Sequence, residues 1–160
     1  MIKKIAILLL VLLNIGCDQI SKDVVRKTVA PNDYIQVLND NFILTNVENT
    51  GAMLGFGQSF SPIVKIILFQ ILPILVLIVL LFRILWKTNM NLWSIVAFAF
   101  VIGGGIGNLI DRVAYGSVTD FFQLKMGFLR TGIFNMADVS VTTGVLLLLF
   151  LSFRSNKSVL

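Results

Sequence analysis

The sequence predicts an all-α membrane protein, a bundle of four transmembrane helices with a small outer β-hairpin and with both termini in the cytoplasm. Only 13% of its 160 residues are charged and 57% are hydrophobic, whereas soluble domains carry about 25% charged residues. Four apolar stretches also approach the length of about 20 residues that crosses a bilayer. We therefore expect residues 1–160 to form one membrane-embedded domain.

The predicted spans cover residues 5–19, 63–86, 92–110 and 138–153. Because the first and fourth are short, we expect their polar ends to continue the helix into a protein-lined interior. Ser61 and Pro62 are typical of an N-cap and first helical position for the second span. The glycines of residues 103–107 favour close helix packing in the third span, and they are not a phosphate loop because they lie inside an apolar span.

The distribution of charge predicts the orientation of the bundle. Short segments rich in Lys and Arg stay cytoplasmic. Such cations gather at the two termini and between the second and third spans, at Lys3, Lys4, Arg83, Lys87, Arg154 and Lys157. All eight acidic residues fall on the other half, in or beside an outer insert at 20–62 and an outer loop at 111–137. Within the insert, residues 34–37 and 42–45 flank a turn-type cluster and predict the hairpin.

The chain has no His and a single Cys, which argues against imidazole catalysis, an internal disulfide, a metal site and a cofactor. Asn14 to Cys17 follow a basic and then apolar start, as at the end of a lipoprotein signal peptide. Three further spans follow, however, where a lipoprotein has a soluble body. We therefore interpret Cys17 as a small buried residue near the end of a helix.

Four acids lie at the outer edge of the predicted spans: Asp18, Asp111, Asp120 and Asp138. Acids at a membrane edge face a bundle interior or a wet cavity, so they are candidates for function. Structural roles remain open: an ion pair with Arg112 for Asp111, a loop turn for Asp120, and a helix cap for Asp138 or Asn135. Two close carboxylates form an acid–base pair, because mutual repulsion keeps a proton on one of them. The apolar neighbours of Asp120 predict a raised pKa there, and a helix start favours ionised Asp138.

Five blocks, taken in order along the chain, resemble the lipoprotein signal peptidases (type II signal peptidases) of bacteria. They are Asp18-Gln19 with Lys22, Asn49-Thr-Gly51-Ala52, Gly103-Gly104 leading to Gly107-Asn108-Leu-Ile-Asp111-Arg112, Gly116-Ser-Val118-Thr-Asp120-Phe121, and Phe134-Asn135-Met-Ala137-Asp138. The resemblance covers nearly the whole chain. It implies a membrane-embedded aspartic endopeptidase whose catalytic residues are Asp120 and Asp138.

The resemblance also implies a set of residues that support this pair or the substrate: Asp18, Lys22, Asn49, Gly51, Asn108, Asp111, Arg112 and Asn135. The implied reaction removes signal peptides from prolipoproteins just before a Cys that carries diacylglycerol. The implied enzyme is a multi-pass monomer of the bacterial cytoplasmic (inner) membrane, with its active site on the outer side. It contacts membrane lipid, takes no nucleic acid, and binds peptide inhibitors of the globomycin type.

Two other classes of protein account for some of these residues. A small ion or proton transporter would use Asp18, Asp111 and Asp138 as a relay, but that predicts acids near the bilayer midplane rather than at one edge. A non-enzymatic scaffold would pair the acids with Arg112, Lys125 and Arg130. In a scaffold, Asp→Asn changes would lower stability without a specific catalytic loss.

Overall fold

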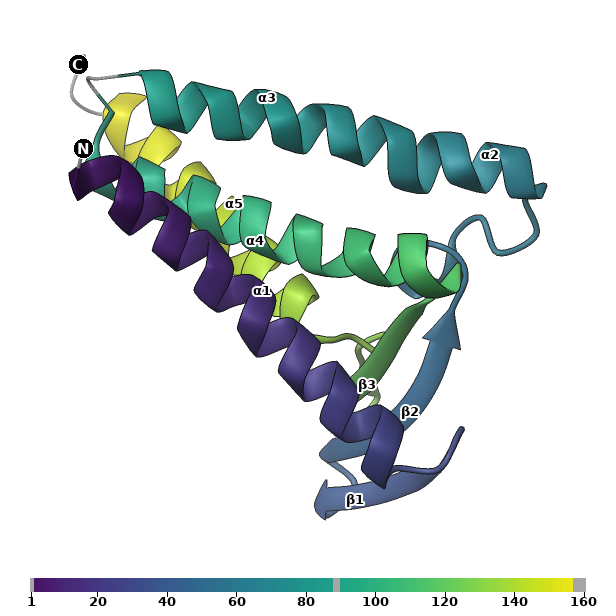
Figure 1. Ribbon diagram of the computed structural model, residues 1–160. Helices are drawn as coiled ribbons and strands as arrows, with labels where there is room; N and C mark the ends of the chain where they lie inside the picture. The colour runs from purple at the N-terminus through teal and green to yellow at the C-terminus, as the bar shows by residue number, and fades with distance from the viewer. Residues whose placement is uncertain (1, 88–89, 157–160) are drawn as a thin grey trace.

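The computed structural model describes residues 2–87 and 90–156. Four helices in these ranges are long and apolar enough to cross a membrane: Lys3–Thr28, Pro62–Trp86, Leu92–Tyr115 and Met136–Arg154. The four predicted spans are therefore confirmed as helices of membrane-spanning length. Figure 1 shows that the start of the first helix lies at one end of the molecule and that a small β-sheet lies at the other.

Helix α1 (Ile2–Thr28) and helix α4 (Leu92–Tyr115) extend beyond their apolar stretches. The predicted ends at residues 19 and 110 are thus too early. The added turns carry polar side chains on a buried face, and Lys22 and Asp111 have no exposed surface. The expectation that polar residues continue the first span into a protein-lined interior is confirmed.

The second span is one continuous run of helix that changes its hydrogen-bonding pattern near its start. It comprises α2 (Pro62–Ile66), a π-helical turn η2 (Ile67–Ile71) and α3 (Leu72–Trp86). Pro73 has no N–H to donate to the carbonyl of Phe69, and a π-turn is one way in which a helix accommodates such a gap. Pro62 is the first helical residue as predicted, but Ser61 makes no side-chain capping bond.

Helix α4 contacts α1, α3 and α5 (Met136–Asn156). Its glycines allow this contact. A Cβ at Gly103 would lie 2.5 Å from Asn14 Cβ, one at Gly104 would lie 2.4 Å from the Ala137 carbonyl oxygen, and one at Gly107 would lie 2.6 Å from Asp18 Oδ2. These distances are too short for a side chain, so the packing interpretation of the glycine cluster is confirmed.

The sheet is larger than the predicted hairpin. Strands β1 (Tyr34–Leu38) and β2 (Phe42–Asn49) form that hairpin, with Tyr34 opposite Thr45. β2 also pairs antiparallel with β3 (Val118–Met126), and β3 with the short β4 (Leu129–Arg130), giving the order β1-β2-β3-β4. Residues 111–137 therefore form the end of α4 and two strands rather than a loop. The predicted bundle of four helices is present, and its β-structure is a sheet of four strands rather than the hairpin alone.

Two further predictions differ from the structure or lie outside it. Cys17 is exposed on α1, not buried. It belongs to the same apolar outer surface as Leu13 and Ile20, which are both more than half exposed. Lys157, counted above among the cytoplasmic cations, lies outside the described residues.

Candidate active site

Asp120 lies on β3 with only 5% of its surface exposed. Pairing between β2 and β3 places Val47 opposite Asp120, so Asn49, two residues further along β2, reaches the same face of the sheet. Asn49 Nδ2 donates to Asp120 Oδ2 at 2.9 Å, and Asn135 Nδ2 donates to Asp120 Oδ1 at 2.6 Å. Both carboxylate oxygens are thus held by neutral amides.

Asp138 is held in place by the way α5 begins. Asn135 precedes the helix, and its Oδ1 accepts from the backbone N–H of Asp138 at 3.0 Å. Asp138 Oδ2 in turn accepts from the backbone N–H of Asn135 at 3.2 Å. This reciprocal pair is a capping box, so both candidate caps take part. Because the helix occupies Asn135 Oδ1, the Nδ2 of the same amide is left to point at Asp120.

Asn108, on α4, bonds Asp138 directly and is linked to Asp120 through Asn135. Its Nδ2 donates to Asp138 Oδ1 at 2.9 Å, and its Oδ1 accepts from Asn135 Nδ2 at 3.1 Å and from Lys22 Nζ at 2.9 Å. A charged ammonium on Oδ1 fixes which end of the amide is the donor. Asn108 is therefore oriented toward Asp138 by Lys22, just as Asn135 is oriented toward Asp120 by the helix start.

The surroundings of Asp120 favour a retained proton. Burial, together with the negative charge of Asp138, raises the pKa of Asp120 from 3.8 to about 6. The amide donors of Asn49 and Asn135 act in the opposite direction and lower the pKa. The direction of this shift agrees with the expectation drawn from the apolar neighbours of Asp120.

Asp18 and Asp111 have a different environment, a buried ion cluster. Lys22 Nζ lies 2.7 Å from Asp18 Oδ2 and 3.1 Å from Asp111 Oδ2, and Arg26 Nη2 lies 2.9 Å from the same Asp111 oxygen. Asp18 Oδ1 also accepts from the backbone N–H of Ala137 at 2.8 Å, in the first turn of α5. Two acids and two cations balance one another here, and the cluster fixes α1, α4 and α5 together.

The ion pair considered for Asp111 and Arg112 is absent, because neighbouring residues on a helix point in different directions. Arg112 instead donates from Nη2 to the Gly51 carbonyl oxygen at 3.1 Å, and its guanidinium lies 5.8 Å from the Phe69 ring centroid. The positive charge of Arg112 interacts with Asp138 and Asp120. Arg112 is thus a cation near the acid pair that makes no direct contact with it.

Gly51 connects the site to the segment that follows β2, which includes the 3-10 helix η1 (Met53–Gly55). Its N–H donates to Asn49 Oδ1 at 2.9 Å, so one Asn side chain bonds both this segment and Asp120. A Cβ at Gly51 would lie 2.5 Å from the Phe56 carbonyl oxygen. Only glycine permits so close an approach without a shift in the backbone.

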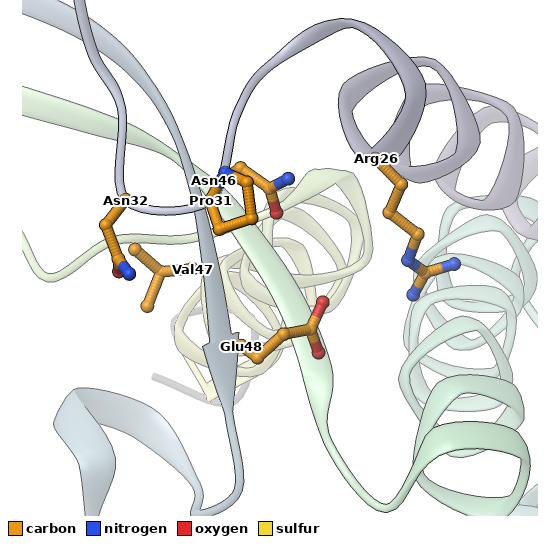
Figure 2. Close-up of a pocket in the computed structure, with 6 residues that line it drawn as sticks. All are labelled: Arg26, Pro31, Asn32, Asn46, Val47 and Glu48. Atoms are coloured by element: carbon orange, nitrogen blue, oxygen red, sulfur yellow. The ribbon is translucent and has the colours of Figure 1, made fainter.

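A pocket of about 290 Å³ lies beside the sheet and is separate from the acid pair; it is lined by Arg26, Pro31, Asn32, Asn46, Val47 and Glu48. Figure 2 shows Arg26 and Glu48 extending toward one another from α1 and β2. Arg26 Nε donates to Thr119 Oγ1 at 2.7 Å, and that hydroxyl donates to Glu48 Oε1 at 2.7 Å. The charges that line this pocket are therefore already partnered by the protein.

Sequence reasoning missed Arg26, Thr119 and Glu48. A signal for Arg26 exists in the spacing of Asp18, Lys22 and Arg26, which recur every four residues and so share one face of a helix. That face becomes visible only if the first helix is carried past its apolar stretch. No comparable pattern links Thr119 to Glu48, which meet through strand pairing.

The arrangement suits acid–base chemistry. A buried carboxyl with a raised pKa faces a second carboxylate at a helix start, and oriented amides hold both. Among residues 2–87 and 90–156, no group of three or more His, Cys, Asp or Glu side chains could hold a metal ion. The fold and site define a helical membrane protein with a pair of amide-held carboxylates at the sheet end of its bundle.

Comparison with known proteins gives the family. The sequence pattern of signal peptidase (SPase) II matches residues 10–154. The chain is 36% identical to a lipoprotein signal peptidase of Streptococcus thermophilus (strain CNRZ 1066) over 97% of each chain. It is 34% identical to a lipoprotein signal peptidase of Moorella thermoacetica over 88% of each chain. The chain belongs to the lipoprotein signal peptidase (signal peptidase II) family, and is therefore a protease.

A solved structure agrees with this assignment. A bacterial membrane enzyme determined by the in meso method at 2.3 Å resolution superposes with a TM-score of 0.85. It shares 29% sequence identity, and the match covers 96% of this chain and 90% of that one. The four apolar helices and the antiparallel sheet are thus the fold of a membrane enzyme of this type.

Proposed function

We propose that this protein is an intramembrane aspartic endopeptidase that cleaves diacylglyceryl-modified prolipoproteins just before the lipidated Cys, with Asp120 and Asp138 as its catalytic pair. One contrast carries the proposal. Asp18 and Asp111 form ion pairs with Lys22 and Arg26, whereas Asp120 and Asp138 receive hydrogen bonds from neutral amides and backbone N–H groups. An acid that must exchange a proton during a reaction cannot be locked against a cation.

In this mechanism Asp138 is the base and Asp120 is the acid. Ionised Asp138 takes a proton from a water molecule, whose oxygen attacks the scissile carbonyl carbon. Protonated Asp120 donates its proton to the carbonyl oxygen as the tetrahedral intermediate forms. Collapse of the intermediate breaks the C–N bond. The proton held by Asp138 passes to the leaving amine, and a hydroxyl group of the intermediate returns a proton to Asp120.

The segment after β2 supports a substrate that is partly lipid. Met53, Leu54 and Phe56 are each at least 65% exposed, at 83%, 76% and 65%. Gly51 connects this apolar segment directly to Asn49 and Arg112 beside the acid pair. The segment would lie against the membrane surface and cover the scissile bond, which excludes bulk water and strengthens the electrostatic contacts inside.

The same proposal includes the orientation and the setting of the enzyme. The cations of the two termini and of the connection between α3 and α4 place those segments in the cytoplasm. The sheet and the acid pair then face the outer side of the cytoplasmic membrane. The enzyme works as a monomer without a cofactor, and peptide inhibitors of the globomycin type compete with the substrate. A C-terminal alkaline phosphatase fusion should be inactive in cells; an active fusion would reverse the orientation.

The function itself is tested with purified protein in detergent and two versions of one prolipoprotein, with and without the diacylglyceryl group on its Cys. We expect release of the signal peptide from the modified form alone, and a product whose mass begins at the lipidated Cys. Equal cleavage of both forms would contradict the substrate class. No cleavage, while another signal peptidase II cuts the same sample, would contradict the activity.

A further inference from the structure

The end of the bundle opposite the sheet carries a second pocket, of about 410 Å³, that has no part in the proposed chemistry. It is lined by the first turns of α1 and the last turn of α3, through Lys3, Lys4, Ile7, Ile84, Leu85, Trp86 and Lys87. Figure 1 shows these two helix ends lying together, far from the sheet. The volume falls within the range of roughly 300–1,000 Å³ of small-molecule sites.

The lining of this pocket is apolar at its base and cationic at its rim. Ile7 and Ile84 are buried, at 4% and 1% exposure, while Lys4 and Lys87 are exposed. The ammonium of Lys4 lies 5.3 Å from the ring centroid of Trp86, which itself is 63% exposed. The buried Ile7 and Ile84, the Trp86 ring and the ammonium groups of Lys4 and Lys87 together fit a molecule with one apolar part and one anionic part.

The depth of the pocket indicates where that molecule comes from. The spans of membrane-crossing length begin at Lys3 and end at Trp86, so the pocket lies where the hydrocarbon core gives way to headgroups. Trp and Lys at this level are typical of the membrane interface. Basic pockets between helices at such a surface bind anionic lipid headgroups.

The sequence places no acidic side chain in the segments next to Lys4 and Lys87. All eight acids lie between residues 18 and 48 or between 111 and 138, which are the segments near the sheet end. The rim therefore has an excess of positive charge, whereas the pocket beside the sheet has Glu48 and Arg26 together. An anion from outside these segments would complement the charges of Lys4 and Lys87.

We propose that this pocket binds the phosphate headgroup of an anionic phospholipid, with Lys4 and Lys87 contacting the phosphate and an acyl chain lying along Ile7 and Leu85. In the orientation proposed above, this lipid belongs to the cytoplasmic leaflet. The pocket shares no residue with the acid pair, so this proposal can be tested separately from the proposed peptidase activity.

The test measures lipid binding to the purified full-length protein by native mass spectrometry and by thermal unfolding in detergent. The probes are phosphatidylglycerol, phosphatidylcholine with the same chains, and inorganic phosphate. The Lys4→Gln/Lys87→Gln double variant should lose about 30-fold in phosphatidylglycerol affinity, at about fivefold per lysine near a charged headgroup. The Lys125→Gln/Arg130→Gln variant, which loses equal charge at the sheet end, should bind as the wild type does.

A Lys4→Arg/Lys87→Arg variant keeps the charge and should retain binding, which separates loss of the site from loss of the fold. Equal affinity of the wild type for the two lipids would overturn the proposal. So would an equal loss in both double Gln variants, because that would show a general charge effect. Competition by inorganic phosphate as strong as that by the lipid would assign the site to a free anion and overturn the choice of a lipid.

Discussion

Two groups of carboxylates lie near one another at the sheet end of the bundle, linked through Asn108. The two groups differ in the charge of the side chains that bind them. Asp18 and Asp111 are compensated by Lys22 and Arg26 at salt-bridge distance. Asp120 and Asp138 accept hydrogen bonds from side-chain amides that carry no charge. The first group is bound by charged partners and the second by uncharged ones. Identical side chains thus differ in this molecule through the partners that bind them.

The two groups are joined at one residue. Asn108 accepts from Lys22 in the ion cluster and donates to Asp138 in the acid pair. The ion cluster therefore both holds three helices together and sets the orientation of an amide in the site. The transporter alternative is disfavoured, because Asp18 and Asp111 are paired with the cations Lys22 and Arg26.

The largest change in stability should come from breaking the ion cluster. Lys22→Met leaves Asp18 and Asp111 buried with one cation between them, and unpaired buried charges cost about 3–5 kcal/mol. Thermal unfolding in detergent measures this loss. Lys27→Met on the same helix is the matched control, because the Lys27–Asp23 pair is exposed and contributes less than about 1 kcal/mol. Equal melting temperatures for the two variants would remove the structural role of the cluster.

A smaller effect should follow from removing the residue that joins the two groups. Asn108→Leu deletes the donor to Asp138, and a hydrogen bond to a charged group is equivalent to about 10- to 100-fold in kcat/KM. Asn91→Leu, at the other end of α4, removes an N-cap bond to Trp93 and should leave kcat/KM unchanged. Wild-type kinetics for Asn108→Leu would show that Asp138 needs no oriented amide.

The next largest effect should be a shift in the pH dependence of kcat/KM. With the pKa of Asp120 near 6, kcat/KM should fall as the pH rises through that value, because Asp120 then loses the proton it donates. Asn49 lowers this pKa, so Asn49→Leu should move the falling limb to higher pH. Gln123 lies on β3, as Asp120 does, but its side chain bonds the Thr131 carbonyl. Gln123→Leu should therefore leave the falling limb where it is. A shift to lower pH in Asn49→Leu would contradict the assignment of the limb to Asp120.

The smallest effect concerns stability and pH together. A carboxyl whose pKa is raised by folding stabilises the protein at low pH, and that stability is lost as the pH rises through the folded-state value, here about 6. Asp120→Asn cannot ionise. The melting temperature of this variant relative to wild type should therefore increase between pH 5 and pH 8. If the melting temperature of Asp120→Asn instead decreased relative to wild type over this range, folding would favour the ionised form of Asp120.

Much of the fold could be predicted from the sequence, whereas the long-range contacts of the candidate site could not. Apolar run lengths predicted four spans, and the turn-type residues at 39–41 predicted the hairpin of β1 and β2. The pairing of β2 with β3 brings together residues about 70 positions apart, such as Val47 and Asp120, which no local pattern encodes. Composition also gave no reason to prefer Asp120 over Asp111; the family resemblance made that choice.

The ends of the helices and the exposure of Cys17 were also predicted incorrectly from the sequence. α1 continues to Thr28 because a buried ion cluster compensates its polar residues, and an apolar-run criterion does not detect such compensation. Cys17 was expected to be buried as a small apolar residue, but in a membrane protein the outer surface is itself apolar. An exposed Cys among Leu13 and Ile20 is consistent with a lipid-facing position.

The central claim is that the amide-held pair, and not the ion-paired acids, performs hydrolysis. The most direct measurement is cleavage of a diacylglyceryl-modified prolipoprotein by Asp120→Asn, Asp138→Asn and Asp111→Asn, each beside wild type and each checked for its melting temperature. We predict that the first two remain folded and lose at least about 10³-fold in rate, since general acid–base groups contribute about 10²–10⁴-fold each. Asp111→Asn should lose stability first and keep activity in proportion to the folded protein. Near-wild-type cleavage by a folded Asp120→Asn or Asp138→Asn variant would contradict the account.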